Sequence, residues 1–428
     1  MYSLLAFINC SSCIDFLNCT PLSFTILYIA LLYLKIMSIN SENFSLLSKL
    51  PQYVFSSVNE LKYQARSRGE DIIDFGMGNP DQPTPRHIIE KLLESSLQGR
   101  NHRYSVSAGL PKLRLAISSW YKRNYNVDLD PEKETIVTIG SKEGLSHLMI
   151  SLLAPGETVL VPDPCYPIHS FSVLIARGNI KEYDSIKDDK LLENIEKGLK
   201  SEPKPKALII SFPSNPTTQT VDLDFFREIV SLGKKYSVIV IHDFAYADIC
   251  FDDFKAPSFL QATGAIDVGV ESFSLSKSYN MAGWRVGFMC GNKEVISALK
   301  RVKSYLDYGI FQPIQISAIT ALNETQDCVN QIRDRYKMRR NRLVDGLNKI
   351  GWEIEKPKAT MFVWAKIPDK YLDLGSLEFS KKLIKECSVA VSPGIGFGSR
   401  GDEYVRFALI ENEQRIQQAA KSMKKLFK

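Results

Sequence analysis

The chain is poor in histidine. Three of its eight cysteines lie in the first 19 residues, and the other five are scattered without metal-like spacing. None of the five histidines clusters with cysteines or carboxylates, so we predict no metal site. Cysteines scattered in this way are typical of reduced thiols in the cytoplasm. The net charge is +6, yet no block of like charge is long enough for a nucleic-acid-binding tail. We therefore expect no nucleic-acid partner, and any anionic ligand should be a small molecule held at one site.

Charge is nearly missing from residues 1–36, which carry only Asp15 and Lys35. Residues 22–34 are an uncharged apolar run of 13 residues, which is short for a membrane span. The basic residues that precede a signal-peptide core are missing as well. We predict that residues 1–36 are a leader outside the fold, that Met37 is the functional start, and that the protein binds no membrane. A membrane-anchoring segment is the alternative.

The length of the chain predicts two domains, because 428 residues are too many for one simple hydrophobic core. Short apolar runs alternate with helical patterns from about residue 130. Continuous apolar runs are typical of strands buried on both faces of a parallel sheet, so we predict an α/β fold. The expected strands span residues 135–139, 158–161, 207–211, 238–242, 268–274 and 286–289, with a helix at 222–235.

The last hundred residues show a different pattern, which predicts a smaller α+β domain. A long helical stretch is expected at 314–349, strands at 352–354, 362–366 and 404–408, and a helix at 376–386. The predicted division is an arm at 37–75, a large mainly parallel-sheet domain at 76–313 and a small domain at 314–428.

Polar residues follow four of the predicted strands. Tyr166 follows one strand, Asn215 the next, Asp243 and Tyr246 the third, and Lys277 the fourth. Ligands of open α/β sheets bind beyond the carboxyl ends of the strands. We therefore predict that these side chains meet at one rim of the sheet.

Lys277 is the most informative of these residues. A lysine at the end of a buried strand is costly unless it has a use. Desolvation lowers the pKa of an amine, and a neutral amine can attack an aldehyde. Ser274 and Arg285 flank Lys277 and suit a phosphate group. An exposed loop lysine is the alternative interpretation.

Two further patterns indicate anion binding. Ser141 and Lys142 follow a strand and open a helix, where free backbone amides attract anions. Arg406 is a lone arginine in an apolar strand, which suits a bidentate contact to a carboxylate, and Gly78 would let the backbone approach the same group. The alternatives are a plain helix cap, a structural salt bridge and a turn.

Four segments, 139–145, 277–285, 303–309 and 391–398, resemble the class I/II aminotransferases, and the likeness is greatest to their glutamate–pyruvate (alanine) branch. The resemblance extends from about residue 51 to the C-terminus. It implies the fold type I architecture, in which a large domain binds pyridoxal 5'-phosphate beside a smaller domain.

The resemblance also implies residue roles. Lys277 would bind the cofactor covalently and move protons, while Asp243 would pair with the pyridine nitrogen. Tyr104 would reach the phosphate in the neighbouring subunit, which implies a homodimer with a shared site. The implied cofactor-binding set is Ser141, Lys142, Tyr166, Asn215, Asp243, Tyr246, Ser274, Lys277, Arg285 and Tyr104, and the implied substrate-binding set is Gly78, Asn215 and Arg406.

The implied activity is ping-pong transfer of an amino group between an L-amino acid and a 2-oxo acid. The branch resemblance implies L-alanine and 2-oxoglutarate as substrates, in amino-acid biosynthesis in the cytoplasm. Aspartate or LL-diaminopimelate aminotransferases and carbon–sulfur lyases of the same fold are the alternatives. A cofactor-binding regulator would need a DNA-binding domain, and residues 1–50 are too short and too uncharged for one.

Overall fold

The computed structural model describes residues 46, 50, 54–186 and 188–427. The predicted leader at 1–36 and the start at Met37 lie outside these residues. All elements described below belong to one compact unit, residues 52–428. Within the described part, no helix is both long enough and apolar enough to cross a membrane.

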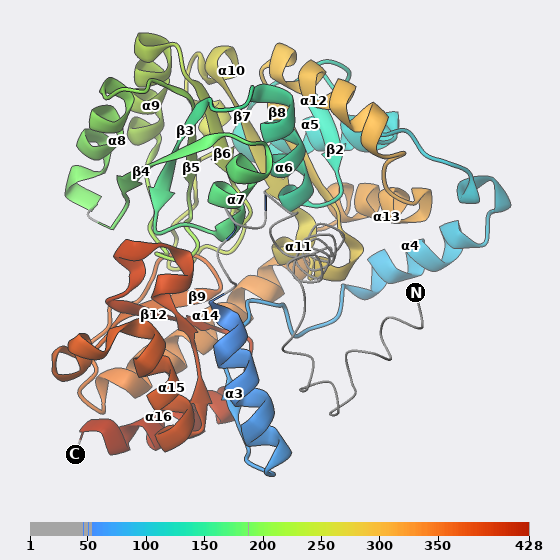
Figure 1. Ribbon diagram of the computed structural model, residues 1–428. Coiled ribbons are helices and arrows are strands. Elements are labelled where there is room, and N and C mark those ends of the chain that lie inside the picture. Colours follow the sequence, from blue (N-terminus) through green and yellow to red (C-terminus); the bar gives the residue numbers. More distant parts are fainter. Residues whose placement is uncertain (1–45, 47–49, 51–53, 187, 428) are drawn as a thin grey trace, which may run out of the picture. The chain divides into compact units, whose positions relative to one another are not determined.

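A seven-stranded sheet forms the centre of the unit (Figure 1). Its strand order is β2-β8-β7-β6-β5-β3-β4, and β8 runs antiparallel to both neighbours while the other pairs are parallel. The predicted mainly parallel α/β sheet is therefore confirmed. The strands are β2 (Thr135–Thr138), β3 (Thr158–Asp163), β4 (Asn179–Asp184), β5 (Pro205–Ser211), β6 (Ile239–Asp243), β7 (Gly269–Ser274) and β8 (Gly287–Gly291).

The edge strand β4 was not predicted from the sequence. It pairs with β3 alone, and most of its side chains are exposed or partly exposed. Such a strand needs no continuous apolar run, so its polar sequence did not indicate a strand.

Helices cover both faces of this sheet. Leu208 and Ile210 of β5 pack into one hydrophobic cluster, whereas Ala207 and Ile209 pack into another, as the alternation of strand side chains requires. The first cluster includes α5 (Pro111–Tyr125), α8 (Leu191–Lys200), α9 (Leu223–Tyr236) and α13 (Gln312–Asn323). The second includes α6 (Ser141–Leu152), α7 (Pro167–Ile175) and α12 (Lys293–Leu306).

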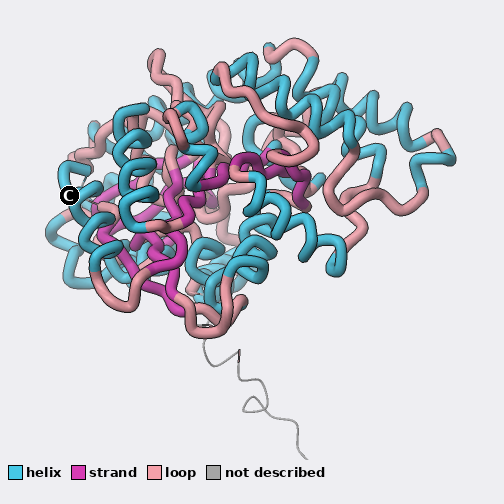
Figure 2. The backbone as a smooth tube through the Cα atoms, turned by 90° about the horizontal axis from the view of Figure 1, so that it is seen from above, coloured by secondary structure: helices cyan, strands magenta, loops and turns pink. Residues whose placement is uncertain are grey.

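A separate core gathers the C-terminal elements. Its antiparallel sheet, of order β11-β12-β9, packs with three helices, and helices flank the strands in Figure 2. A parallel pair, β1 with β10, joins the N-terminal part to this region. The elements are β1 (Ile73–Asp74), β9 (Phe362–Lys366), β10 (Val389–Ala390), β11 (Ser392–Pro393), β12 (Tyr404–Ala408), α3 (Phe55–Ser67), α14 (Asp327–Asn348), α15 (Gly375–Cys387) and α16 (Glu413–Met423). Helix α4 (Arg86–Ser96) instead contributes Ile88 to the first cluster of the large sheet.

Two expectations for this region were wrong. The helical stretch at 314–349 is two helices, α13 and α14, because the Gln326 side chain donates to the carbonyls of Ala321 and Glu324 at the break. Residues 352–354 form no strand. Trp352 is buried through its side chain, whose Nε1 donates to the carbonyl of Lys366, so the segment joins the core without pairing its backbone. The domain boundaries at residues 76 and 314 stay predictions.

Glu271 on β7 is a fully buried carboxylate that ties several elements of the large core together. It accepts hydrogen bonds from the hydroxyls of Tyr121 (2.8 Å) and Ser258 (2.7 Å) and from the backbone N of Phe259 (2.7 Å). His242 Nδ1 lies 2.8 Å from the same carboxylate. A buried charge is tolerated only with such a set of partners.

Replacing Glu271 by alanine should therefore lower the free energy of unfolding by about 3–5 kcal/mol, because three buried donors lose their acceptor. Urea denaturation of the variant and the wild type in the same cofactor state measures this. Glu90→Ala is the control, since Glu90 forms only an exposed ion pair on α4. Equal urea midpoints for the two variants would contradict the prediction.

Candidate active site

One cavity of about 330 Å³ brings together the predicted site residues at the carboxyl ends of β5, β6 and β7. Tyr104 is the exception: it does not line this cavity, and it is 84% exposed. The predicted residues that do line it are Gly78, Ser141, Lys142, Tyr166, Asn215, Asp243, Tyr246, Ser274, Lys277, Arg285 and Arg406.

Lys277 reaches the cavity from α11 (Leu275–Ser278), the single helical turn that follows β7. Its Nζ donates to the carbonyl of Gly78 at 2.7 Å. Burial lowers the pKa of Lys277 to about 7, and the positive charges of Arg406 and Arg285 act in the same direction. A large share of the amine is therefore neutral at physiological pH and able to act as a base or a nucleophile.

Asp243 ends β6 and is buried at the cavity wall. Its Oδ2 accepts a hydrogen bond of 2.9 Å from Nε2 of His169, which lies in the first turn of α7. Its Oδ1 is buried and has no hydrogen-bond partner among the described residues. That oxygen can accept a hydrogen bond from a ligand, as the predicted partner of a protonated ring nitrogen must.

His169 was missed in the sequence, although it lies three residues after Tyr166. Burial would lower the pKa of this histidine, but the hydrogen bond and charge of Asp243, with a contribution from Cys165, raise it to about 9. His169 is therefore protonated at neutral pH, with its Nε2 2.9 Å from the carboxylate of Asp243. The signal available was its spacing from Tyr166, which places both at the start of one helix.

The start of α6 forms a place for an anion. Gly140 has a φ of 74°, and a Cβ there would lie only 2.3 Å from Nη2 of Arg285. Glycine is therefore required both for the left-handed backbone and for the approach of the guanidinium. The free amides of the first turn and the Arg285 guanidinium together suit a phosphate group. Ser274, buried at the end of β7, also lines the cavity.

Arg406 on β12 is buried between the rings of Phe362 and Phe397, whose centroids lie 4.1 and 4.5 Å from its guanidinium carbon. Its Nη1 donates to Oδ1 of Asn215 at 2.6 Å, and Asn215 Nδ2 donates to the Tyr246 hydroxyl at 3.4 Å. The planar guanidinium is thus held in one orientation at the cavity, which suits a carboxylate ligand.

Tyr246 stays protonated in this setting. Burial raises the pKa of Tyr246 far above its ordinary value, and the charge of Arg406 offsets only part of that effect. The phenol can therefore donate a hydrogen bond to an anionic oxygen of a ligand.

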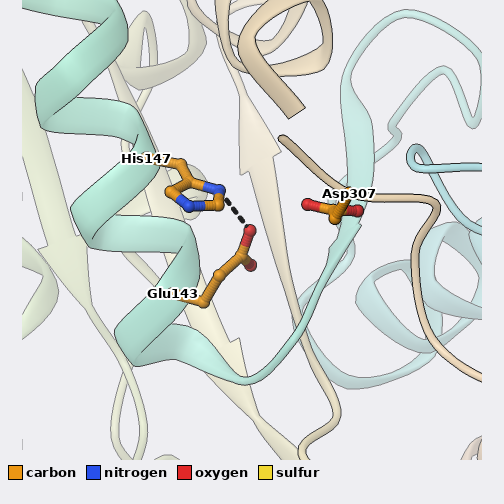
Figure 3. Close-up of side chains that lie close together, drawn as sticks. All are labelled: Glu143, His147 and Asp307. Atoms are coloured by element: carbon orange, nitrogen blue, oxygen red, sulfur yellow. Dashed lines mark ion pairs between the residues drawn. The ribbon is translucent and has the colours of Figure 1, made fainter. Parts of the chain in front are cut away.

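Glu143, His147 and Asp307 place three metal-ligand types close together at the start of α6 (Figure 3). The buried Lys303 occupies this cluster, with its Nζ 2.6 Å from Glu143 Oε1 and 2.8 Å from Asp307 Oδ2. Burial raises the pKa of Glu143, but His147 and Lys303 outweigh it and lower the pKa. Since an ammonium bridges both carboxylates, the cluster is best explained as an ion-pair network that anchors α6 to α12.

Tyr104 lies on the surface beside a second exposed aromatic residue. Its ring centroid is 4.7 Å from that of Tyr308, and its carbonyl accepts a hydrogen bond of 3.5 Å from Gln312. Leu97 and Tyr305 in the neighbouring segments are 84% and 87% exposed. An apolar surface of this kind is typical of a protein–protein contact.

The pair formed by His169 and Asp243 makes the free energy of unfolding fall as the pH rises. The folded pKa of about 9 exceeds the ordinary histidine value of 6.5, so the pair stabilises the fold fully below pH 6.5 and loses this effect as the pH rises through 9. The loss of unfolding free energy in His169→Asn should therefore be greater below pH 6.5 than above pH 9. Urea denaturation at both pH values measures it, with the exposed His102→Asn as control, and an equal loss at both would contradict it.

Comparison with known proteins agrees with this geometry. The family model "Aminotransferase class I and II" matches residues 70–423. Glutamate-pyruvate aminotransferase AlaC of Escherichia coli (strain K12) is 56% identical over 386 residues, which cover 90% of this chain and 94% of that protein. LL-diaminopimelate aminotransferase of Moorella thermoacetica is 42% identical, with 88% and 96% covered.

Among solved structures, substrate-bound BacF from Bacillus subtilis matches with a TM-score of 0.84 and 35% identity, covering 91% of this chain and 98% of that one. The predicted fold type I architecture is therefore confirmed. With a family model and relatives that span most of its length, the chain belongs to the class I and II aminotransferases and is a transaminase.

Proposed function

We propose that the protein is a pyridoxal 5'-phosphate-dependent aminotransferase that converts L-alanine and 2-oxoglutarate into pyruvate and L-glutamate. The observation that carries the substrate assignment is the 56% identity to a glutamate-pyruvate aminotransferase over 90% of the chain. The diaminopimelate aminotransferases are more distant, at 42% identity and below. The described cysteines are free, as in a reducing cytoplasm, where we place the enzyme in amino-acid biosynthesis.

The cavity offers residues that suit both the ring nitrogen and the phosphate of the cofactor. The unpartnered Oδ1 of Asp243 suits the protonated ring nitrogen, and the amides of Ser141 and Lys142 with Arg285 suit the phosphate. Tyr166 would pack against the ring, and Asn215 and Tyr246 would hydrogen-bond its phenolic oxygen. When bound, pyridoxal phosphate supplies an aldehyde that captures an amine and a ring that withdraws electrons from the substrate Cα.

The chain's own residues then divide the work. Arg406 binds the α-carboxylate of the substrate and fixes its orientation, while Gly78 lets the backbone approach the same group. The neutral amine of Lys277 would take the proton from the substrate Cα as a base and deliver it to C4′ of the cofactor as an acid. Asp243, hydrogen-bonded to His169, would pair with the protonated ring nitrogen. The amino group stays on the enzyme until a second 2-oxo acid arrives, so the kinetics are ping-pong.

The exposed aromatic surface around Tyr104 supports a homodimer. Since Tyr104 lies outside the cavity of its own chain, the proposal is that it completes the phosphate site of a second copy. Each active site would then contain residues of both subunits.

The half-reactions test the proposed activity. L-Alanine alone should change the visible absorbance of the cofactor-loaded enzyme and release one pyruvate per site, and 2-oxoglutarate should restore the spectrum and yield L-glutamate. Lys277→Ala should slow pyruvate release by about 10²–10⁴-fold through loss of the base, whereas the exposed Lys293→Ala should not. Conversion of LL-diaminopimelate but not L-alanine, or release of ammonia and pyruvate from a sulfur amino acid, would sink the proposal.

Mixing two impaired variants, Tyr104→Phe and Lys277→Ala, tests the shared site. In a hybrid dimer both substitutions would fall in the same site, so the other site should be intact. After the two variants are unfolded and refolded together, activity should exceed the mean of the parents. Tyr63→Phe serves as the control for Tyr104→Phe, because Tyr63 is also an exposed tyrosine and should keep the wild-type cofactor affinity. No gain on mixing would argue against a site built from two subunits.

A further inference from the structure

One wall of the active-site cavity comes from the N-terminal helix α3, to which the sequence assigned no role. Val58, Asn59 and Lys62 all line the cavity. Lys62 is 8% exposed, which is unusual for a lysine. A buried ammonium at the wall of a binding site needs a reason.

The local partners of Lys62 do not use its full hydrogen-bonding capacity. Its Nζ donates to Oδ2 of Asp74 at 3.0 Å, and Asp74 is its sole acceptor among the described residues. The same carboxylate accepts from Arg66 Nη2 at 3.2 Å and, through Oδ1, from the backbone N of Gly76 at 2.9 Å. An ammonium has three donors, so two N–H groups of Lys62 are left for a ligand. One carboxylate also faces two cations, which leaves positive charge at the wall.

Lys62 lies near the group that orients Arg406. A Cβ on Gly76 would be 3.6 Å from Lys62 Nζ, and the Gly76 carbonyl accepts from Arg406 Nη2 at 3.3 Å. Two cations thus approach one residue of the cavity wall. A molecule with two carboxylates can contact Arg406 with one and Lys62 with the other.

The other basic side chains that line the cavity have other contacts or expected roles. Lys277 donates to the Gly78 carbonyl, and Lys142 and Arg285 lie at the start of α6, where the phosphate is expected. Among the described residues of the cavity, Lys62 is therefore the basic side chain available for a substrate side chain.

We propose that Lys62 determines specificity by binding the side-chain carboxylate of the dicarboxylic substrate, glutamate or 2-oxoglutarate. This inference rests on the proposed aminotransferase function and names the group that reads the longer substrate. Alanine and pyruvate have no second carboxylate. Their turnover should therefore be independent of Lys62, so one cavity serves both a small and an acidic side chain.

Half-reaction kinetics of Lys62→Met test this directly. The variant should lower kcat/KM for L-glutamate by roughly 10–100-fold, as expected for a lost charge-assisted hydrogen bond, and that for L-alanine by less than about threefold. Lys62→Arg should keep part of the glutamate activity. Arg66→Met is the matched control, since Arg66 pairs with the same Asp74 but does not line the cavity. Arg66→Met should leave kcat/KM unchanged for both L-glutamate and L-alanine.

An equal loss for both substrates, or a similar effect of Arg66→Met, would show that Lys62 only holds α3 in place and would overturn the proposal. If Lys62→Met kept the wild-type preference for L-glutamate over L-alanine, that result would overturn the proposal as well.

Titration calorimetry with glutarate and butyrate separates this failure from failure of the proposed function. Glutarate should bind more tightly than butyrate to the wild type but not to Lys62→Met, whichever amino acid the enzyme converts. If the wild type cannot convert L-alanine while this difference persists, the activity assignment fails and the role of Lys62 stands. If the wild type shows no preference for glutarate, the role of Lys62 fails.

Discussion

The charge balance around Lys277 is the constraint on which the rest of the site depends. Burial, together with the positive charges of Arg406 and Arg285, lowers the pKa of this lysine to about 7. No carboxylate of the described residues pairs with its amine, which donates a hydrogen bond to the Gly78 carbonyl. A single acid placed beside Lys277 would restore the ammonium and remove the base. The fold therefore supplies a base near neutral pH by collecting cations and keeping anions away from this one nitrogen.

The negative charge that the site needs is held elsewhere. Asp243 lies at the end of β6, the strand next to β7. His169 hydrogen-bonds one oxygen of its carboxylate, and the other oxygen has no hydrogen-bond partner among the described residues. The pairing with Asp243 raises the pKa of His169 to about 9. Two basic groups of the site are thus shifted in opposite directions, because the pKa of Lys277 is lowered and that of His169 is raised.

Much of this arrangement could be predicted because it follows from regular structure. Continuous apolar runs predicted the central strands, and parallel strands place the residues after them at one rim, which brought Asp243 and Lys277 together. The break between α13 and α14 carries no glycine or proline and depends on side-chain contacts of Gln326, so the pattern did not indicate it. His169 and Lys62 are important because of their partners Asp243 and Asp74, which lie elsewhere in the sequence. A local sequence pattern does not reveal such pairs.

The segment from Asp74 to Gly78 explains how substrate recognition and proton transfer can share one scaffold. Asp74 binds Lys62, the Gly76 carbonyl accepts from Arg406, and the Gly78 carbonyl accepts from Lys277. Three basic side chains of the cavity therefore contact one segment of five consecutive residues. The segment pairs with β10 only at its start, through Asp74. In the proposed mechanism, this short backbone would therefore hold both the residues that bind the substrate and the amine that moves its proton.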